Sequence, residues 1–180
     1  MKKLTAICLL LIAAPAFAEP TTLRLSPSNG RITFHIAHLL GSVEGSFENF
    51  RGQLKYDPQN LATSSISWEV NVRGINTGNN YRDTHLATAE YFDADKFPTL
   101  SFTSTSTRVV DSSHLEVTGK FTLKGVTKII TVPVTGGGQG FDSEFTVKRS
   151  DYGFTGGRPA VGDDVEVKIH LLPSASWTGH

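Results

Sequence analysis

The chain has 180 residues, with 17 Lys and Arg against 17 Asp and Glu, so its formal net charge is zero. A nucleic-acid-binding protein is disfavoured, because binding to phosphates requires a basic surplus or patch. Intrinsic disorder is disfavoured too, because 38% of the residues are hydrophobic and only 19% are charged. The only continuously apolar stretch lies at the N-terminus, which argues against a polytopic membrane protein.

Residues 1–18 have the pattern of a signal peptide. Lys2 and Lys3 form a basic n-region, and Leu9–Ala14 lie at the centre of an apolar h-region too short to span a bilayer. Ala16-Phe17-Ala18 fits the small-x-small cleavage pattern, which predicts cleavage after Ala18. An uncleaved anchor is the alternative. A lipoprotein is excluded because Cys8 lies inside the h-region.

The predicted mature chain, residues 19–180, forms one domain without an internal repeat. It loses two lysines and its cysteine, which leaves 15 basic residues against 17 acidic ones and a net charge of −2. A domain of this length buries roughly 70% of its unfolded surface, so its core can stabilise it without disulfides. The bacterial type of the signal peptide predicts export to the periplasm.

Apolar and polar residues alternate along most of the mature chain. Such a period of two, with one polar face, predicts antiparallel strands around a shared interior. Helical crossovers between strands are missing from the pattern, so a parallel sheet is not expected. Clear strands are predicted at 32–36, 65–72, 115–123, 145–148 and 165–171, and weaker ones at 43–56, 99–106 and 128–134, about eight in total.

Turn residues separate the strands, and one segment departs from the alternation. Residues 81–92 have a helix-compatible composition and follow the longest loop, so a short helix or lid is predicted there. The glycine run at 136–140 predicts a hairpin loop, and residues 173–180 are expected to fray. Strand number alone suits either a sandwich or a barrel.

Several kinds of catalytic and metal sites find no support. His35 and His38 are three positions apart, so on a strand they point to opposite faces and cannot chelate one ion. Neither a GxSxG nucleophile motif nor a P-loop occurs. The closely spaced acids Asp93 and Asp95, or Asp163 and Asp164, are better explained as solvated turn residues than as a glycosidase pair. We therefore expect no metal and no catalytic residues.

The most distinctive polar cluster is Arg82-Asp-Thr-His85-Leu86. As a structural element, Asp83 would cap a short helix and Arg82 would pair locally. As a functional element, Arg82 and His85 would face the polar end of a ligand at a barrel mouth. The residues alone leave both interpretations open.

Several short motifs follow one another along the mature chain. They are His38 with Gly45-Ser-Phe47 and Phe50-Arg-Gly52, Arg82–Leu86, Tyr91-Phe-Asp93, Phe97–Phe102, Gly119–Lys128, Arg149-Ser-Asp-Tyr-Gly153, and Val161–Val165. Any one of them is weak, but their joint order is specific. Taken in this order, they resemble the motifs of the YceI-like family of periplasmic lipid-binding proteins.

The resemblance implies an all-β fold, an eight-stranded antiparallel lipocalin-like barrel with a short helix or lid. It also implies a non-enzymatic carrier or sequestering protein for a polyisoprenoid such as a quinone or prenyl phosphate, without another cofactor. Homodimers are an expectation from the family, and stable membrane insertion is not expected. An envelope lipid-modifying enzyme and a closed barrel with a structural or interaction role are the alternatives. The residues expected to line the ligand are Phe34, Ile36, His38, Phe47, Trp68, Val70, Arg82, His85, Phe102, Phe121 and Phe145.

Overall fold

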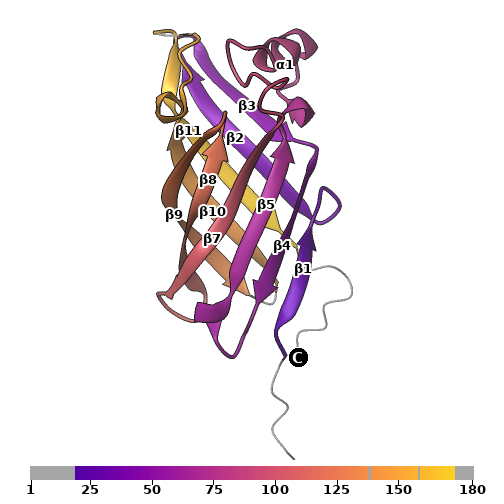
Figure 1. Ribbon diagram of the computed structural model, residues 1–180, viewed down its shortest axis with the longest axis vertical. Helices are drawn as coiled ribbons and strands as arrows, with labels where there is room; N and C mark the ends of the chain where they lie inside the picture. Colours follow the sequence, from indigo (N-terminus) through magenta and orange to yellow (C-terminus); the bar gives the residue numbers. More distant parts are fainter. Residues whose placement is uncertain (1–18, 138, 158, 173–180) are drawn as a thin grey trace, which may run out of the picture.

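A computed structural model describes residues 19–137, 139–157 and 159–172 (Figure 1). The predicted signal peptide, the predicted frayed tail and part of the predicted 136–140 loop lie outside these residues. Within them, no helix is long and apolar enough to cross a membrane.

The described chain forms one antiparallel sheet of eleven strands, in the order β1-β4-β5-β7-β8-β9-β10-β11-β2-β3-β6. This confirms the all-β antiparallel class, with three strands more than expected. The predicted strand 43–56 is interrupted at 48–49, and two further short strands pair at the ends of the sheet. The strands are β1 (Thr21–Leu25), β2 (Gly30–His38), β3 (Gly41–Phe47), β4 (Phe50–Tyr56), β5 (Ser65–Asn71), β6 (Ile75–Asn76), β7 (Thr99–Val109), β8 (His114–Leu123), β9 (Val126–Gly137), β10 (Gly140–Lys148) and β11 (Val161–Leu171).

Four helical segments connect the strands. The predicted helix is present, although it is shorter than the segment that suggested it. The segments are the 3-10 helices η1 (Leu61–Thr63), η2 (Val72–Gly74) and η3 (Arg149–Tyr152) and the α-helix α1 (Asn80–Leu86). Figure 1 places α1 at one end of the molecule, which we call the upper end.

The sheet curls back on itself, so that its two ends come together. The chain passes from β3 to β4 through only residues 48 and 49, although these strands lie near opposite ends of the sheet order. Backbone hydrogen bonds hold this corner: Asn71 N–H donates to Asn49 O at 2.8 Å, and Glu48 N–H donates to Gly74 O at 2.8 Å. The interior is therefore enclosed by a single continuous sheet.

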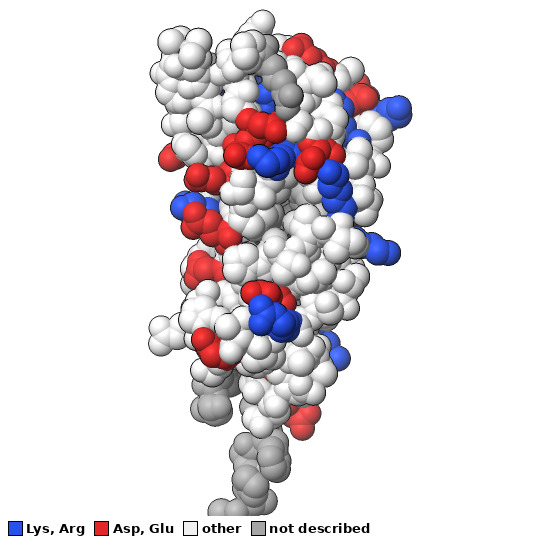
Figure 2. Space-filling view, turned by 90° about the vertical axis from the view of Figure 1, so that its left-hand side faces the viewer, with Lys and Arg blue, Asp and Glu red and all other residues white. Residues whose placement is uncertain are grey.

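The alternation of side chains separates an apolar inside from a polar outside. Phe102, Phe121 and Trp68 are all buried, and Trp68 stacks on Phe102 with ring centroids 5.9 Å apart. Outside, ion pairs join residues directly opposite in register, as between Lys148 and Asp164 (2.7 Å) on β10 and β11. Because a slip of one residue would reverse every face, such pairs and the apolar interior favour the same register. Figure 2 shows both signs of charge interspersed over one outer face.

One buried cation organises the upper end between β10 and β11. Arg149 begins η3 and is only 5% exposed. Its guanidinium donates to one carbonyl oxygen in the following connection, that of Gly156 (2.6 Å), and to two at the start of β11, those of Val161 (3.0 Å) and Gly162 (2.7 Å). Hydrogen bonds to one charged donor thus tie the connection and the first residues of β11 to the end of β10.

We predict that Arg149→Met lowers the free energy of unfolding by about 2–4 kcal/mol, because the three carbonyls lose a charged donor. The matched control is Arg51→Met. Arg51 pairs with Glu69 at 2.9 Å, but its side chain is 81% exposed, so the expected loss is below about 1 kcal/mol. Urea unfolding monitored by tryptophan fluorescence measures the free energy of unfolding of both variants. Equal losses in the two variants would contradict the structural role of Arg149.

Candidate functional site: an apolar cavity at the upper end

The upper part of the barrel contains a cavity of about 490 Å³. Its walls are mainly aliphatic and aromatic side chains from β2, β3, β8, β10 and β11, with the α1 segment at the top. Inward-facing residues such as Phe34, Ile36 and Phe145 are only half-buried, although their strand positions turn them away from the outer surface. Their remaining exposed area therefore faces the cavity, which is the size and chemistry of a small-molecule site.

Two aromatic side chains form the floor of this cavity. Trp68 and Phe145 line both it and a second, smaller apolar cavity of about 50 Å³. The small cavity also touches Phe102, the stacking partner of Trp68. The interior is therefore a tunnel divided by two rings into a large upper and a small lower chamber.

The aromatic wall depends on close approach between strands. A Cβ atom on Gly45 would lie 2.3 Å from Cζ of Phe34, so only glycine allows that ring to cover β3. Phe34 then contacts Phe47 with centroids 5.5 Å apart, and Phe47 meets Phe92 edge-on at 6.3 Å. This row of rings continues the wall of the barrel into the segment that follows α1.

The polar groups of the cavity gather near α1. Asn79 caps the helix, its side chain accepting from Arg82 N–H at 3.0 Å. Arg82 donates through Nε to Thr77 Oγ1 (2.7 Å) and through Nη2 to Thr77 O (2.8 Å). Asp83 accepts from Thr77 N–H at 3.0 Å. Arg82 therefore pins the helix, and it also lines the cavity.

His85 lies on the same helix and lines the same cavity. Its Nε2 is 3.1 Å from a carboxylate oxygen of Glu90, and its ring meets that of Tyr91 edge-on at 5.1 Å. Tyr81 lines the cavity as well, yet it is 84% exposed. The cavity therefore opens to solvent beside α1, and its entrance carries a guanidinium, an imidazole and a phenol.

The structure brings nine of the predicted ligand-lining residues together around the large cavity. They are Phe34, Ile36, His38, Phe47, Trp68, Arg82, His85, Phe121 and Phe145. Two others lie elsewhere. Val70 is fully buried in the packed core, and Phe102 faces the small chamber. Alternation places both inside the barrel, but neighbouring side chains cover them.

Other lining residues were not expected from the sequence. Arg149 lines the cavity, although the sequence marks it only as part of a family motif. Phe92 and Phe154 line the cavity as well, and their ring centroids are 5.1 Å apart. The glycine-flanked loop before α1 could have indicated Thr77, because loops at barrel ends carry ligand contacts. The lining residues missed in this way include Thr77, Tyr81, Tyr91, Phe92, Arg149, Phe154 and Val161.

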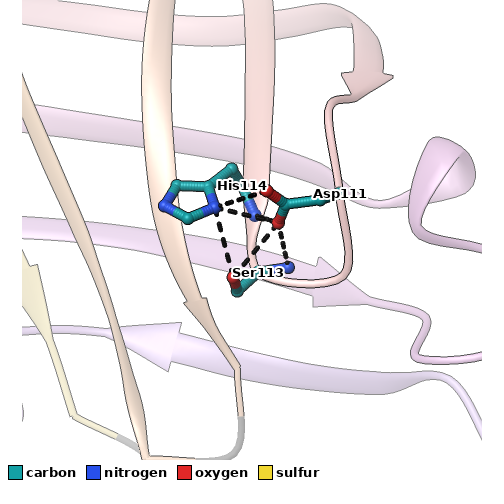
Figure 3. Close-up of polar contacts among 3 residues, drawn as sticks. All are labelled: Asp111, Ser113 and His114. Atoms are coloured by element: carbon teal, nitrogen blue, oxygen red, sulfur yellow. Dashed lines mark hydrogen bonds and ion pairs between the residues drawn. The ribbon is translucent and has the colours of Figure 1, made fainter.

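A serine, a histidine and an aspartate do meet (Figure 3), in the turn between β7 and β8 at the end of the molecule opposite α1 (Figure 1). In the β7–β8 turn, His114 Nδ1 lies 2.8 Å from Asp111 Oδ1 and 3.2 Å from Ser113 Oγ. A catalytic triad uses opposite ring nitrogens for the acid and the nucleophile, whereas here both contacts share Nδ1. Asp111 also accepts from the Ser113 N–H at 2.8 Å, so the cluster is the hydrogen-bonded cap of a turn.

The described residues do not form a metal-binding site either. Across residues 19–137, 139–157 and 159–172, no three His, Cys, Asp or Glu side chains are grouped so that they could hold an ion. Four of the described histidines, His35, His85, His114 and His170, instead each contact a single carboxylate, as His170 does with Asp142 at 2.6 Å.

A curled antiparallel sheet around an apolar cavity with a polar entrance defines the class of small β-barrels with an internal site. The particular family follows from comparison with known sequences. The model of the YceI-like domain matches residues 23–172, and the chain belongs to this family. Protein YceI of Salmonella newport is 30% identical over 93% of each chain. The UPF0312 protein ECA1782 of Pectobacterium atrosepticum is 32% identical over 92% of each.

Solved structures show the same fold. BcnA of Burkholderia cenocepacia superposes with a TM-score of 0.77 at 29% identity, covering 83% of this chain and 99% of that one. A polyisoprenoid binding domain from Saccharophagus degradans gives a TM-score of 0.64 at 13% identity, covering 86% and 100%. The second likeness is one of fold alone.

The Asp111 turn predicts a specific pH dependence. The Ser113 N–H and then His114 hold the pKa of Asp111 down to about 2, from an ordinary value of 3.8. A carboxyl whose pKa is depressed in the folded state contributes stability above pH 3.8, and this contribution is lost as the pH falls through about 2. We expect Asp111→Asn to remove this contribution to stability. The difference in Tm between the wild type and the variant should therefore shrink as the pH falls from 4 to about 2.

Carboxyl-detected NMR titration measures the pKa of Asp111 directly. His114→Ala removes one of the stabilising hydrogen bonds and should raise the pKa of Asp111, whereas His170→Ala, which affects a different carboxylate, should not. An Asp111 that titrates near 3.8 in the wild type would show that the turn is not formed in solution.

Proposed function

We propose that the protein binds a long apolar lipid in the upper cavity and carries or sequesters it in the periplasm, with a polyisoprenoid such as a quinone or prenyl phosphate as the best-fitting class. The observation that carries the proposal is the apolar cavity of about 490 Å³, open beside α1. A barrel that is closed and filled with side chains does not describe this half of the molecule.

Burial of the chain would supply most of the affinity. Apolar ligand surface removed from water contributes about 25 cal/mol per Å², and a prenyl chain offers several hundred Å² before the costs of association. Aromatic rings such as Phe34, Phe47 and Phe92 can pack on prenyl double bonds without hydrogen bonds. This mode of binding requires a cavity that fits the chain and excludes water, rather than specific polar partners.

The head group would lie at the entrance. Arg82 and His85 line it from α1, and His38 lines it from the end of β2. A guanidinium suits phosphate or carbonyl oxygens, and an imidazole can donate or accept a hydrogen bond. The tunnel would thus orient the ligand with its chain toward Trp68 and its head toward solvent.

Relatives support a binding role rather than catalysis. The Saccharophagus protein of the same fold is described as a polyisoprenoid binding domain. Because that likeness concerns the fold alone, the choice of lipid for this chain depends on its own cavity. A lipid-modifying enzyme would need a reactive group beside the ligand, and the Ser113-His114 turn between β7 and β8 lies at the end of the barrel opposite α1 (Figure 1).

The direct test is mass spectrometry of organic extracts from the purified full chain, expressed with its leader. A stoichiometric prenyl lipid supports the proposal. Protein that is empty after mild purification and takes up no added prenol or quinone contradicts it. Conversion of an added lipid into a product would favour the enzyme.

We predict that Arg82→Ala weakens binding of a prenyl phosphate or quinone roughly tenfold or more, because a charge-assisted hydrogen bond contributes about 1.5–3 kcal/mol. Binding of the head-less hydrocarbon chain should change little. Fluorescence titration with both ligands, read beside a thermal melt, separates this effect from the bonds to Thr77. Equal losses for both ligands would mean that Arg82 only pins the helix.

We also predict that Phe145→Leu lengthens the prenyl chain that binds best, because it opens the floor between the two chambers. Phe34→Leu is the matched control, since Phe34 lines the upper chamber only. Affinities for a series of prenols of increasing length measure the preference. An equal shift in both variants would show that the chambers do not join at Phe145.

A further inference from the structure

The three most exposed large apolar side chains of the described residues lie on α1 and on the turn between β2 and β3, next to residues that line the cavity. Leu40, Tyr81 and Leu39 are 90%, 84% and 82% exposed, whereas the next large hydrophobic residue, Ile129, is 61% exposed. Leu39 and Leu40 form the tip of the β2–β3 hairpin. Single exposed apolar residues are common on proteins, but two adjacent leucines, each more than 80% exposed and directly following a cavity-lining residue, call for an explanation.

The hairpin tip is part of the cavity rim. His38, the residue before Leu39, lines the cavity and pairs in register with Val161, which lines it too. Tyr81 lines the cavity from α1 while most of its own surface is in solvent. The apolar interior therefore continues outward onto Leu39, Leu40 and Tyr81, which we call the apolar rim.

This rim is held in place by hydrogen bonds. Leu39 N–H donates to Ala160 O at 2.7 Å, and Leu40 N–H donates to His38 Nδ1 at 3.2 Å. Both backbone donors are thus satisfied while the two leucine side chains project into water. A tip that is held with its apolar side chains outward is arranged to contact another apolar surface.

We propose that the apolar rim docks on the surface of a lipid bilayer, so that lipid passes between the membrane and the cavity without crossing water. This inference rests on the proposed lipid-binding function. A prenyl chain that left the bilayer through water would lose its apolar burial on the way, so contact at the entrance removes the main barrier to exchange. Tyrosine suits the bilayer interface because its ring is apolar and its hydroxyl stays hydrated, and leucine is a side chain that interfacial segments bury at the boundary between headgroups and acyl chains.

The contact is peripheral and apolar rather than electrostatic. Charges of both signs lie near the entrance, as with Arg82 and Glu90, and the predicted mature chain has 15 basic residues against 17 acidic ones, so it carries no cationic surplus for anionic lipid. Two leucines and one tyrosine give reversible attachment, because stable anchoring requires much more buried apolar area. Zwitterionic vesicles should therefore bind the protein, and raising the salt concentration should change that binding little.

The test compares Leu39→Ser/Leu40→Ser with the matched pair Val109→Ser/Val110→Ser. Val109 and Val110 are also adjacent, exposed by 41% and 53%, and lie at the opposite end, where β7 ends and the turn to β8 begins. Flotation with phosphatidylcholine vesicles measures docking, and stopped-flow transfer of a fluorescent prenol from those vesicles measures exchange. Addition of the same prenol from ethanol, without vesicles, measures the capacity of the cavity.

We expect the leucine variant to bind vesicles at least about tenfold more weakly and to take up prenol from them correspondingly more slowly. Its capacity for prenol added from ethanol and its Tm should match the wild type, and the valine variant should match the wild type throughout. Vesicle binding that survives in the leucine variant, or that is absent from the wild type, overturns the docking proposal.

The two proposals fail in different ways. A wild type that takes up prenol from ethanol but does not bind vesicles keeps its lipid-binding function and lacks the docking surface. A wild type that takes up no prenol loses the proposed function, while the flotation result still decides docking. If the leucines instead hold two copies together, sedimentation without vesicles will show a dimer that the variant lacks, and that result also overturns membrane docking.

Discussion

The strict alternation of side chains across one curled sheet is the constraint on which the rest of this structure depends. Every strand turns one set of residues inward, so an apolar interior forms wherever the inward positions are apolar. On the outside, pairs such as Lys148 and Asp164 face one another in register. Because a slip of one residue would bury those charges, the polar face and the apolar face specify the same pairing. The cavity exists because this wall encloses more volume than its inward side chains fill.

The two ends of the barrel differ in chemistry, and that asymmetry supports a direction for the ligand. The β7–β8 end carries the hydrogen-bonded turn of Asp111 and His114, and the small chamber above it is apolar. At the α1 end lie the large chamber, the cationic side chains of Arg82 and Arg149, and the exposed leucines of the β2–β3 hairpin. Binding, orientation of a head group and exchange with a membrane would all take place at this one end.

The predicted strands and the RDTHL segment illustrate how much local sequence can establish. Strand segments such as 115–123 and 165–171 were recognisable because their apolar period matches the pleat, and the family motifs identified the fold. The split at 48–49 and the two-residue strand β6 were not recognisable. Both depend on the corner where the sheet curls back, and such a contact between distant segments leaves no local period. The helix was expected, but Asn79 rather than Asp83 caps it.

The sequence by itself determined the antiparallel all-β class, the family and the inward face of each main strand, because these follow from residue type and from a period of two. Only the tertiary structure decided which inward residues meet the cavity. Val70 and Trp68 share a face of β5, yet Val70 is covered by packed neighbours while Trp68 forms the cavity floor. Alternation specifies a face but not a depth along the barrel, and depth depends on side chains that approach from strands far away in the sequence. The same holds for Arg149, whose burial arises only when the β10–β11 connection and the start of β11 fold against it.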